Sequence, residues 1–383
     1  ILDSSRIAWA KSALVSYVLT LERNAAVRDA EAVIERALAD LRSAHNGDAA
    51  LSAFRAAQNS IAAISLEEKT VQPVHIDDIL PAVVDRVDAR NRGLEEARSL
   101  MTGIEELDAK TGGIEPTDLV FIAARPSMGK TELALDIIDK VSEQGRGVLF
   151  FSMEMPNIQI GERMVSAAGG MSVSRLKKAA DFEDEDWARL TNGVERLTGR
   201  SIWMVDSTDL TVDQIQQIAT RLQLAHPEIA LVVVDYLALI KIESTARYDL
   251  AVGEVSKGLK RLAKSNKTPV LALSQLSRGV ETRPNKRPMN SDLKNSGEIE
   301  ADADLIMMLY RDEVYNPESP AKGIAEINVT KQRNGELGTI YRRFYNGHFL
   351  PIDQELAKQR SAPQQKAQTR RYSKERHSSN ADY

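Results

Sequence analysis

One stretch constrains the fold of this chain more than any other: residues 119–131, with the sequence Leu-Val-Phe-Ile-Ala-Ala-Arg-Pro-Ser-Met-Gly-Lys-Thr. It begins with a short apolar run that predicts a buried strand, and the amphipathic residues 132–141 that follow predict a helix. A strand, a tight loop, Gly-Lys-Thr and a helix together indicate a phosphate-binding loop. Ala124 stands where the general pattern has its first glycine. The stretch therefore predicts a nucleotide-binding domain.

Each part of this loop has a physical role in holding a polyphosphate. Backbone N–H groups at the start of a helix point at the phosphates, and the helix dipole favours negative charge there. Gly129 lets the main chain come close, Lys130 reaches the β- and γ-phosphates, and Thr131 places a hydroxyl on Mg²⁺. The predicted nucleotide-binding residues are Arg125, Pro126, Ser127, Met128, Gly129, Lys130 and Thr131.

The composition is that of an ordinary globular protein, with 43% hydrophobic and 27% charged residues in a chain of 383. This length allows two or three domains. The chain has no cysteine, which excludes disulfides and thiolate metal sites. It has no run as long as a membrane span and no signal peptide, so we expect a cytoplasmic protein with no membrane partner. Because the first residue is Ile, we expect the chain to begin inside a longer gene product.

We divide the chain into four parts. Apolar residues at helical spacing predict an all-α segment at residues 1–68, which we take as a packing or oligomerisation module. Residues 69–100 are predicted to be a linker with one helix, at residues 76–92, whose apolar face packs either on its own domain or on a neighbouring subunit. The ATPase domain is predicted at residues 101–354, and a polar, disordered tail at residues 355–383.

Strands alternate with helices through the ATPase domain. This alternation predicts an α/β fold, in which helices cover both faces of a mostly parallel sheet and ligands bind at the carboxyl ends of the strands. Strands are predicted at residues 119–123, 147–152, 201–205, 229–235, 269–274 and 304–309, with a closing hairpin at 325–330 and 339–344. Helices are predicted at residues 132–141, 157–168, 211–224 and 250–264.

Three polar side chains come at or just after the ends of predicted strands. Glu154 could orient and deprotonate an attacking water, although an ordinary exposed Glu is equally compatible with its position. Asp235 ends an apolar strand and could hold Mg²⁺ directly or through water, although many buried strands end in an Asp that serves as a cap. Gln275 could sense the γ-phosphate and pass its presence to the loop that follows.

Two basic regions are candidates for phosphate contacts. Because the formal net charge is −5, any contact with nucleic acid must come from a local basic surface. The loop at residues 276–299 is long, polar and basic, which suits a phosphodiester backbone, although a solvated surface loop would have the same composition. Lys331 and Arg333 precede the turn signal Asn334-Gly335. This hairpin tip is predicted to lie far from its own phosphate loop, so Arg333 would act in trans on a neighbouring subunit.

Taken together, these motifs resemble those of the replicative DnaB-type helicases. The resemblance covers residues 70–350 at the level of motifs, and residues 4–68 as the end of the family's helical N-terminal domain. The family also has the loop variant without the first glycine, which accounts for Ala124. In chain order, the stretches are Ala-Ala-Arg-Pro-Ser-Met-Gly-Lys-Thr, Ser-Met-Glu-Met, Val-Val-Asp-Tyr-Leu, Leu-Ser-Gln-Leu-Ser-Arg-Gly-Val-Glu, Ser-Asp-Leu-Lys-Asn-Ser-Gly-Glu-Ile-Glu-Ala-Asp-Ala-Asp and Lys-Gln-Arg-Asn-Gly.

This resemblance implies a RecA-like P-loop ATPase domain with a mostly parallel sheet, preceded by an all-α segment and a linker helix. Such a protein would bind ATP and Mg²⁺, assemble as a homo-hexameric ring, and move 5′ to 3′ on single-stranded DNA while it separates the duplex at a replication fork. The helix at residues 76–92 matches the family's linker helix, which docks on the adjacent subunit. Primase and a helicase loader are the family's usual partners.

The resemblance also carries over site residues. The matches to the family's ATPase positions are Lys130, Thr131, Glu154, Asp235 and Gln275, and the matches to its trans-acting basic pair are Lys331 and Arg333. Residues 292–297 match the family's DNA-backbone loop. The family usually has Arg-Glu where this chain has Lys294-Asn295, so the positive charge is kept and the Glu is lost. The candidate DNA contacts are Arg278, Lys294, Asn295 and Gly297.

Two other functions are compatible with the same ATPase fold. A strand-exchange recombinase would form a filament, and the helix at residues 76–92 and the Ser-Arg-Gly-Val-Glu stretch argue against it. A switch or loader would bind ATP without turnover. The presence of Glu154, Asp235 and Arg333 argues against that alternative.

Overall fold

The computed structural model describes residues 73–92, 99–235, 240, 248–293, 296–333 and 335–362, with scattered residues between 32 and 56. The chain divides into two compact units, Ile1–Asp88 and Ala89–Tyr383. This boundary falls inside the segment predicted as the linker. The helices predicted at residues 4–68 lie largely outside the described residues, as does the tail from residue 363, so these two parts of the domain division stay predictions.

Helix α3 (Ile76–Asn91) confirms the helix predicted at residues 76–92. Asp77 and Asp78 lie in its first turn and Arg90 in its last. Acidic residues at the start and basic residues at the end of a helix interact favourably with its dipole. The sequence of this segment thus marks both ends of the helix.

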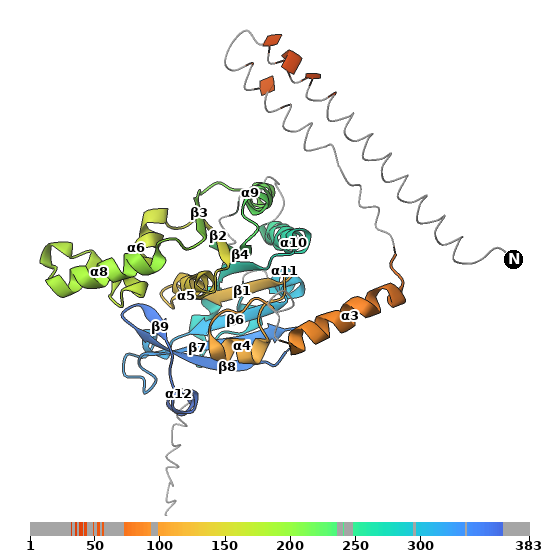
Figure 1. Ribbon diagram of the computed structural model, residues 1–383. Coiled ribbons are helices and arrows are strands. Elements are labelled where there is room, and N and C mark those ends of the chain that lie inside the picture. The colour runs from red at the N-terminus through yellow and green to blue at the C-terminus, as the bar shows by residue number, and fades with distance from the viewer. Residues whose placement is uncertain are drawn as a thin grey trace, which may run out of the picture. The chain divides into compact units, whose positions relative to one another are not determined.

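One sheet organises the second unit. Its strands are β1 (Leu119–Ala124), β2 (Gly147–Ser152), β3 (Ile202–Asp206), β4 (Ile229–Asp235), β5 (Val270–Gln275), β6 (Leu305–Tyr310), β7 (Ile324–Gln332), β8 (Gly338–Tyr345) and β9 (His348–Leu350). Among the described residues they form a nine-stranded sheet in the order β3-β2-β4-β5-β1-β6-β7-β8-β9 (Figure 1). Pairing is parallel from β3 across to β6 and antiparallel from β6 to β9. The predicted α/β class and mostly parallel sheet are confirmed.

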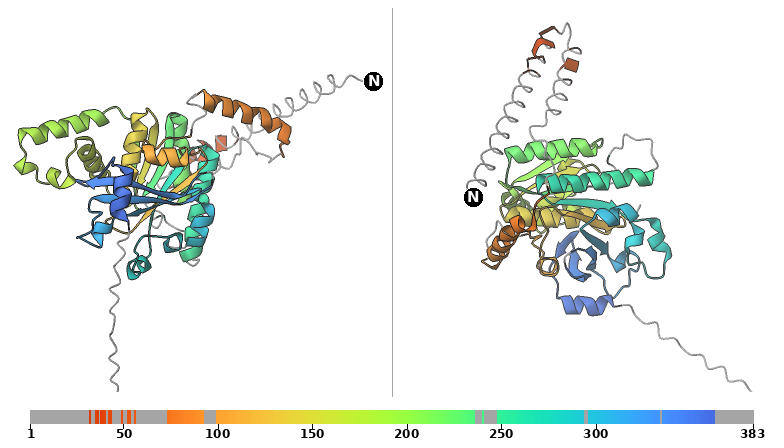
Figure 2. Two further views of the ribbon diagram at one scale, coloured as in Figure 1. Left: turned by 90° about the horizontal axis from the view of Figure 1, so that it is seen from below. Right: turned by 90° about the vertical axis from the view of Figure 1, so that its right-hand side faces the viewer.

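Helices connect the strands and cover both faces of the sheet (Figure 2). They are α4 (Glu105–Thr111), α5 (Lys130–Glu143), α6 (Asn157–Ala168), α7 (Val173–Leu176), α8 (Asp184–Leu197), α9 (Val212–Ala225), α10 (Tyr248–Asn266), α11 (Ser296–Asp302) and α12 (Gln354–Ser361). Short 3₁₀ turns lie at η2 (Ala179–Asp181), η4 (Arg278–Thr282), η5 (Asn290–Asp292) and η6 (Asp312–Val314).

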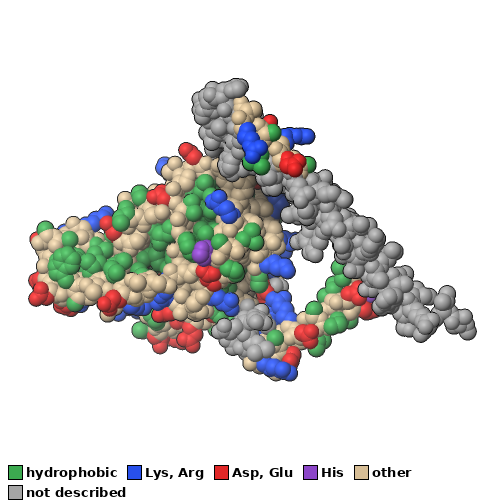
Figure 3. All heavy atoms as spheres, turned by 45° about the horizontal axis from the view of Figure 1, so that its top comes forward, with side chains coloured by type: hydrophobic (Ala, Val, Ile, Leu, Met, Phe, Trp, Pro, Cys, Tyr) green, Lys and Arg blue, Asp and Glu red, His purple; other side chains and the backbone are tan. Residues whose placement is uncertain are grey.

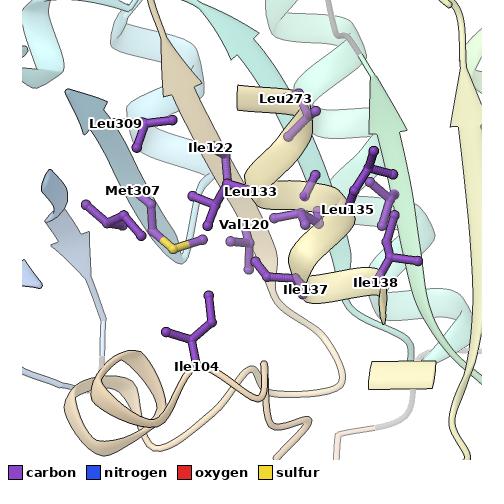
Figure 4. Packing of buried hydrophobic residues seen from close by; sticks show 14 of the residues in the cluster. Ile104, Val120, Ile122, Leu133, Leu135, Ile137, Ile138, Leu273, Met307 and Leu309 are labelled. Atoms are coloured by element: carbon purple, nitrogen blue, oxygen red, sulfur yellow. The ribbon is translucent and has the colours of Figure 1, made fainter. Parts of the chain in front are cut away.

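Alternation along β1 builds one hydrophobic layer on each face of the sheet. Val120 and Ile122 belong to the layer that packs against α5, whereas Phe121 belongs to the opposite layer, under α9 and α10. Figure 4 shows Val120 and Ile122 lying beside Leu133 of α5. Each fully buried Val, Leu or Ile contributes about 1.5–3 kcal/mol relative to an exposed one. This packing holds the end of β1 and the start of α5 in a rigid arrangement.

The predicted strands and helices of this unit are confirmed to within two residues at every end, including the hairpin β7–β8. Six helices and strands of this unit were not predicted: α4, α7, α8, α11, β9 and α12. It was wrong to place residues 355–361 in a disordered tail, since they form most of α12. The Asp353 side chain caps this polar helix by accepting a hydrogen bond from Leu356 N–H at 2.7 Å, and Ala357 is fully buried. Cap and burial stabilise a segment whose composition alone indicates no helix.

Helices α6 and α8 form a lobe in which two backbones come unusually close. A Cβ at Gly193 of α8 would lie 2.4 Å from the carbonyl oxygen of Val165, and a Cβ at Gly169 would lie 2.5 Å from that of Arg189. Apolar side chains appear in green at the left of Figure 3. Ile158 of α6 and Trp187 of α8 are both exposed. The contact between the two helices therefore depends on the absence of side chains at both glycines.

This close approach predicts opposite effects for two glycine substitutions in the lobe. Gly193→Ala should lower the free energy of unfolding by about 1–3 kcal/mol, because the new methyl group meets backbone atoms that cannot move aside. Gly161→Ala is the matched control, since its Cβ would meet nothing within 4 Å. It should raise stability by about 0.4–1 kcal/mol through helix propensity. Urea unfolding of the two variants checks this, and equal effects would contradict the close contact.

Candidate nucleotide-binding site

The predicted phosphate-binding loop joins the carboxyl end of β1 to the first turn of α5. Ser127 and Gly129 adopt positive φ angles of 67° and 100°, which is how the chain reverses within a few residues. A Cβ at Gly129 would lie 3.1 Å from the ring of Phe349, so both conformation and space favour glycine there. Met128 is buried with 1% exposure and anchors the loop in the core. The N–H groups at the start of α5 therefore open onto a fixed loop.

Three predicted residues meet at the end of β4. Thr131 Oγ1 donates a 2.7 Å hydrogen bond to Asp235 Oδ2, and Lys130 Nζ lies 3.2 Å from Asp235 Oδ1. Asp235 is 1% exposed, so its charge is balanced inside the protein by the loop itself. The carboxyl ends of parallel strands meet at one edge of a sheet, which is why a strand end and a helix start 104 residues apart come together.

These residues also fit a small hard cation. Mg²⁺ prefers oxygen ligands and is held by one or two carboxylates together with substrate phosphates and water. Thr131 and Asp235 offer a hydroxyl and a carboxylate in direct contact. Across the described residues there is no group of three or more His, Cys, Asp or Glu side chains suited to a metal. Phosphate oxygens and water would therefore complete the coordination of a cation at this point.

A pocket of about 410 Å³ opens over the loop. Glu154 and Gln275 line it together with Lys130 and Thr131, so the structure brings the predicted ATPase residues to one place. Glu154 is exposed just beyond β2, and Gln275 is half-buried at the end of β5. Sequence reasoning missed three further lining residues. They are Glu132, Met155 and Arg163.

Arg125, predicted as a nucleotide contact, is mainly tied to the segment after β5. Its Nε donates a 2.8 Å hydrogen bond to Glu281, and Nη1 donates a 2.9 Å bond to the carbonyl oxygen of Leu276. Its side chain is also part of the pocket wall. Arg125 thus connects the phosphate loop to the chain that leaves Gln275.

That chain, residues 276–293, is more ordered than the long loop expected from the sequence. The turns η4 and η5 and a bridge between Leu276 and Leu293 organise it. Arg283 pairs with Asp292 at 2.6 Å and Arg287 pairs with Glu326 of β7 at 2.6 Å. The hydrogen bond with Glu326 raises the pKa of the Arg287 guanidinium. The expectation of a long loop was therefore wrong for residues 276–293, and Arg283 and Arg287, two of their basic residues, hold the fold together.

The structure describes two of the four candidate DNA contacts, Arg278 and Gly297. Arg278 is exposed in η4, directly after the strand that ends in Gln275. Gly297 is exposed in the first turn of α11. Lys294 and Asn295 lie outside the described residues, so their predicted contacts stay predictions.

Lys331 and Arg333 lie at one end of the central strands, and the pocket lies at the other end. Gln332 pairs with Leu305 at the start of β6, whereas the last residue of β1, Ala124, pairs with Leu309 near the end of β6. At about 3.3 Å per residue, these two positions are more than 10 Å apart along the strand direction. The predicted distance of this basic pair from its own phosphate loop is confirmed by the register.

Asp304 anchors this basic pair. Its Oδ1 lies 3.1 Å from Arg333 Nε, and its carbonyl oxygen accepts a 3.1 Å hydrogen bond from Arg333 N–H. The Asp304 carboxylate also pairs with Lys260 and accepts a 2.8 Å hydrogen bond from Leu119 N–H. Lys331 Nζ donates to the carbonyl oxygen of Glu300, and burial together with the charge of Arg333 lowers its pKa.

With this geometry established, comparison with known proteins is informative. Residues 99–350 match the protein family described as the DnaB-like helicase C terminal domain. The chain belongs to this family. The replicative DNA helicase DnaB of Buchnera aphidicola subsp. Baizongia pistaciae is 40% identical over 303 residues, which cover 78% of this chain and 65% of that relative. The chain thus spans just under two thirds of the length of this DnaB protein.

Two solved structures confirm the RecA-like α/β fold expected for a DnaB-type ATPase domain. One is itself described as an ATPase domain, and it has a TM-score of 0.69 and 33% identity in a match that covers 74% of this chain and 100% of that one. A DnaB-like replicative helicase, described with its interactions with primase, has a TM-score of 0.67 and 30% identity. That match covers 87% of this chain and 78% of the other. Within the described part of the chain, no helix is both long and apolar enough to cross a membrane.

The position of Glu154 at the pocket predicts a separation of binding from hydrolysis. Glu154→Gln keeps the shape of the side chain and removes its basicity. Nucleoside triphosphate should still bind, while hydrolysis should fall about 10²- to 10⁴-fold, the usual contribution of a positioned base. Glu195→Gln, at an exposed carboxylate on α8, is the control and should hydrolyse at the normal rate. Phosphate release and equilibrium binding measure the two effects, and loss of binding in Glu154→Gln would indicate a structural role.

Proposed function

We propose that this chain is the motor-containing part of a replicative DNA helicase that hydrolyses ATP with Mg²⁺. It moves 5′ to 3′ along single-stranded DNA as a homo-hexameric ring and separates the duplex at a replication fork. One observation carries this proposal: the phosphate pocket and the Lys331–Arg333 pair lie at opposite edges of one sheet. In a second copy of the chain, placed with the start of its β6 toward this pocket, the basic pair can reach the pocket. The pocket's own Lys331 and Arg333 are too far away to do so. Hydrolysis then depends on assembly.

Within one subunit, the pocket residues divide the work on the triphosphate. Mg²⁺ neutralises charge on the β- and γ-phosphate oxygens when it is bound, with Thr131 and Asp235 as the residues to hold it. Lys130 Nζ lies 3.2 Å from Asp235 Oδ1 at the carboxyl ends of the strands. It would turn to the phosphates when nucleotide enters. Glu154 orients the attacking water and accepts its proton.

Between subunits, Arg333 serves as the trans-acting arginine and Lys331 supports it. An arginine supplied in trans stabilises charge that develops in the transition state. Asp304 supports this role because it fixes Arg333 through both the side chain and the backbone. A cation held in place before the neighbour arrives loses little conformational entropy on assembly.

Arg278 and residues 294–297 are proposed to contact the DNA backbone. Position supports Arg278, since the chain that ends β5 at Gln275 continues directly into η4. Residues 294–297 are proposed from the family resemblance alone. A change at the γ-phosphate can therefore reach a DNA contact through three residues of chain. Primase is a proposed partner because a structurally similar DnaB-like helicase is described with primase. A helicase loader is proposed from the family resemblance alone.

The proposal predicts directional unwinding. The full chain should unwind a forked duplex that has a 5′ single-stranded tail when ATP and Mg²⁺ are present, and it should leave a substrate with only a 3′ tail intact. Lys130→Ala should abolish unwinding of the 5′-tailed fork, because the β- and γ-phosphate contact is lost. Gel-based strand separation measures the outcome. Filament formation on DNA without strand separation would favour the recombinase instead.

A mixing experiment tests the trans role of Arg333. Arg333→Ala subunits should bind ATP and assemble normally but hydrolyse it about 10³- to 10⁵-fold more slowly, the range for arginine fingers. Mixed with Lys130→Ala subunits, they form some interfaces with an intact Lys130 on one side and an intact Arg333 on the other. The mixture should therefore regain part of the ATPase activity that neither variant has alone. Failure of mixing to restore activity would place Arg333 in its own subunit's site.

A further inference from the structure

A buried carboxylate lies directly beside the phosphate loop without a role in binding phosphate. Glu132 follows Thr131 in the first turn of α5 and is only 4% exposed. A buried carboxylate is costly unless it is paired, and one beside a polyphosphate would also repel it. The structure must therefore neutralise Glu132 in some other way.

Two cationic partners surround Glu132. His348 Nδ1 lies 2.5 Å from Glu132 Oε1, and Arg163 Nη1 lies 3.7 Å from Oε2. His348 Nε2 lies 2.8 Å from the carbonyl oxygen of Met171. Because both ring nitrogens face acceptors, the surroundings favour the imidazolium form, in which both nitrogens donate. Burial opposes this charge, but the hydrogen bond and the charge of Glu132 outweigh it and raise the pKa of His348.

The partners come from three separate parts of the fold. His348 begins β9, Glu132 lies in α5, and Met171 follows α6, so the imidazolium joins all three. Arg163 lies on α6 with a side chain that is 36% exposed. Glu132 is only one of the groups that the five N–H donors of Arg163 can reach. With one negative and two positive charges, the cluster keeps a net positive charge at the surface of the pocket.

A second cavity, of about 380 Å³, adjoins the phosphate pocket at this cluster. It is lined by Glu132 and Arg163, which also line the phosphate pocket, and by residues 172–174 and 346–347. Glu154 and Gln275, at the proposed γ-phosphate end, line the first cavity and not the second. Since the loop holds the α- and β-phosphates and Lys130 the β- and γ-phosphates, the nucleoside extends away from Glu154. The second cavity, which shares Glu132 and Arg163 with the first and is not lined by Glu154, offers space for it.

We propose that Glu132 and His348 are positioning residues for the nucleoside half of the nucleotide. The pair holds Arg163 at the junction of the two cavities, where its remaining donors can reach the α-phosphate or the ribose. It also fixes the turn at residues 346–347 and the segment at residues 172–174 as the walls of a nucleoside subsite. This inference rests on the proposed binding of ATP at the phosphate loop.

The test compares ATP with inorganic tripolyphosphate, which has the phosphates without the nucleoside. Glu132→Gln and His348→Gln in the full chain should each weaken ATP binding about tenfold, since a charged partner is lost. The same variants should bind tripolyphosphate with less than about a threefold change. His226→Gln is the matched control, because His226 pairs with Glu228 outside both cavities, and it should bind both ligands normally. Calorimetric titration gives the dissociation constants.

Kinetics separates positioning from a general loss of structure. In Glu132→Gln and His348→Gln, KM for ATP should rise. Thermal unfolding in the absence of ligand identifies any variant that fails to fold. If one of them does not fold, the other decides the question. Equal weakening of ATP and tripolyphosphate, or no weakening of either, would overturn the inference. Lys130→Ala should lose both ligands, and its retention of both would overturn the proposed phosphate site instead.

Discussion

The carboxylate of Asp235 is the interaction on which the site depends. It is buried at the end of a central strand, where an unpaired charge would cost several kcal/mol. The groups that pair with it are Lys130 and Thr131, which are also the residues proposed to hold a bound triphosphate. The ends of β1 and β4 and the start of α5 are therefore held together before nucleotide arrives. Nucleotide binding at this loop would exchange partners within a preassembled set and would need no new fold.

Strand β1 links this set to a second one at the opposite edge of the sheet. At its carboxyl end the phosphate loop begins, and at its start Leu119 N–H donates to Asp304, which anchors Arg333. The strand is fully buried between two hydrophobic layers. Close-packed cores have low compressibility and transmit strain. A displacement at the phosphate loop is therefore expected to reach the edge that carries the basic pair with little loss.

Much of this arrangement could be predicted from the sequence, and what was missed has a physical reason. Strand ends such as Asp235 and Gln275 were found because apolar runs mark strands and parallel strands share a carboxyl edge. The order of residues 276–293 was missed because a count of basic residues ignores the partners of Arg283 and Arg287, which are Asp292 and Glu326. The pair of Glu132 and His348, 216 residues apart, has no local pattern at either end.

Helix α8 shows a different kind of omission. Glu183 and Asp186 form a capping box at its start, and Trp187 and Val194 lie seven residues apart on one side of the helix. These signals are present in the sequence and would have identified the helix. Its packing could not have been predicted, because it depends on two glycines that let the backbones approach closely.

The opposite placement of pocket and basic pair also determines what kind of assembly this chain can build. In the proposed assembly two different surfaces meet at each contact, so the contact is heterologous, and repeated contacts would close into a ring or continue as a helix. A twofold dimer would pair like with like and leave every pocket without the partner's arginine. A ring built in this way would have a handed order, in which every subunit receives an arginine from one side and offers its own to the other. Hydrolysis around such a ring would acquire a sense of rotation from the sheet of a single subunit.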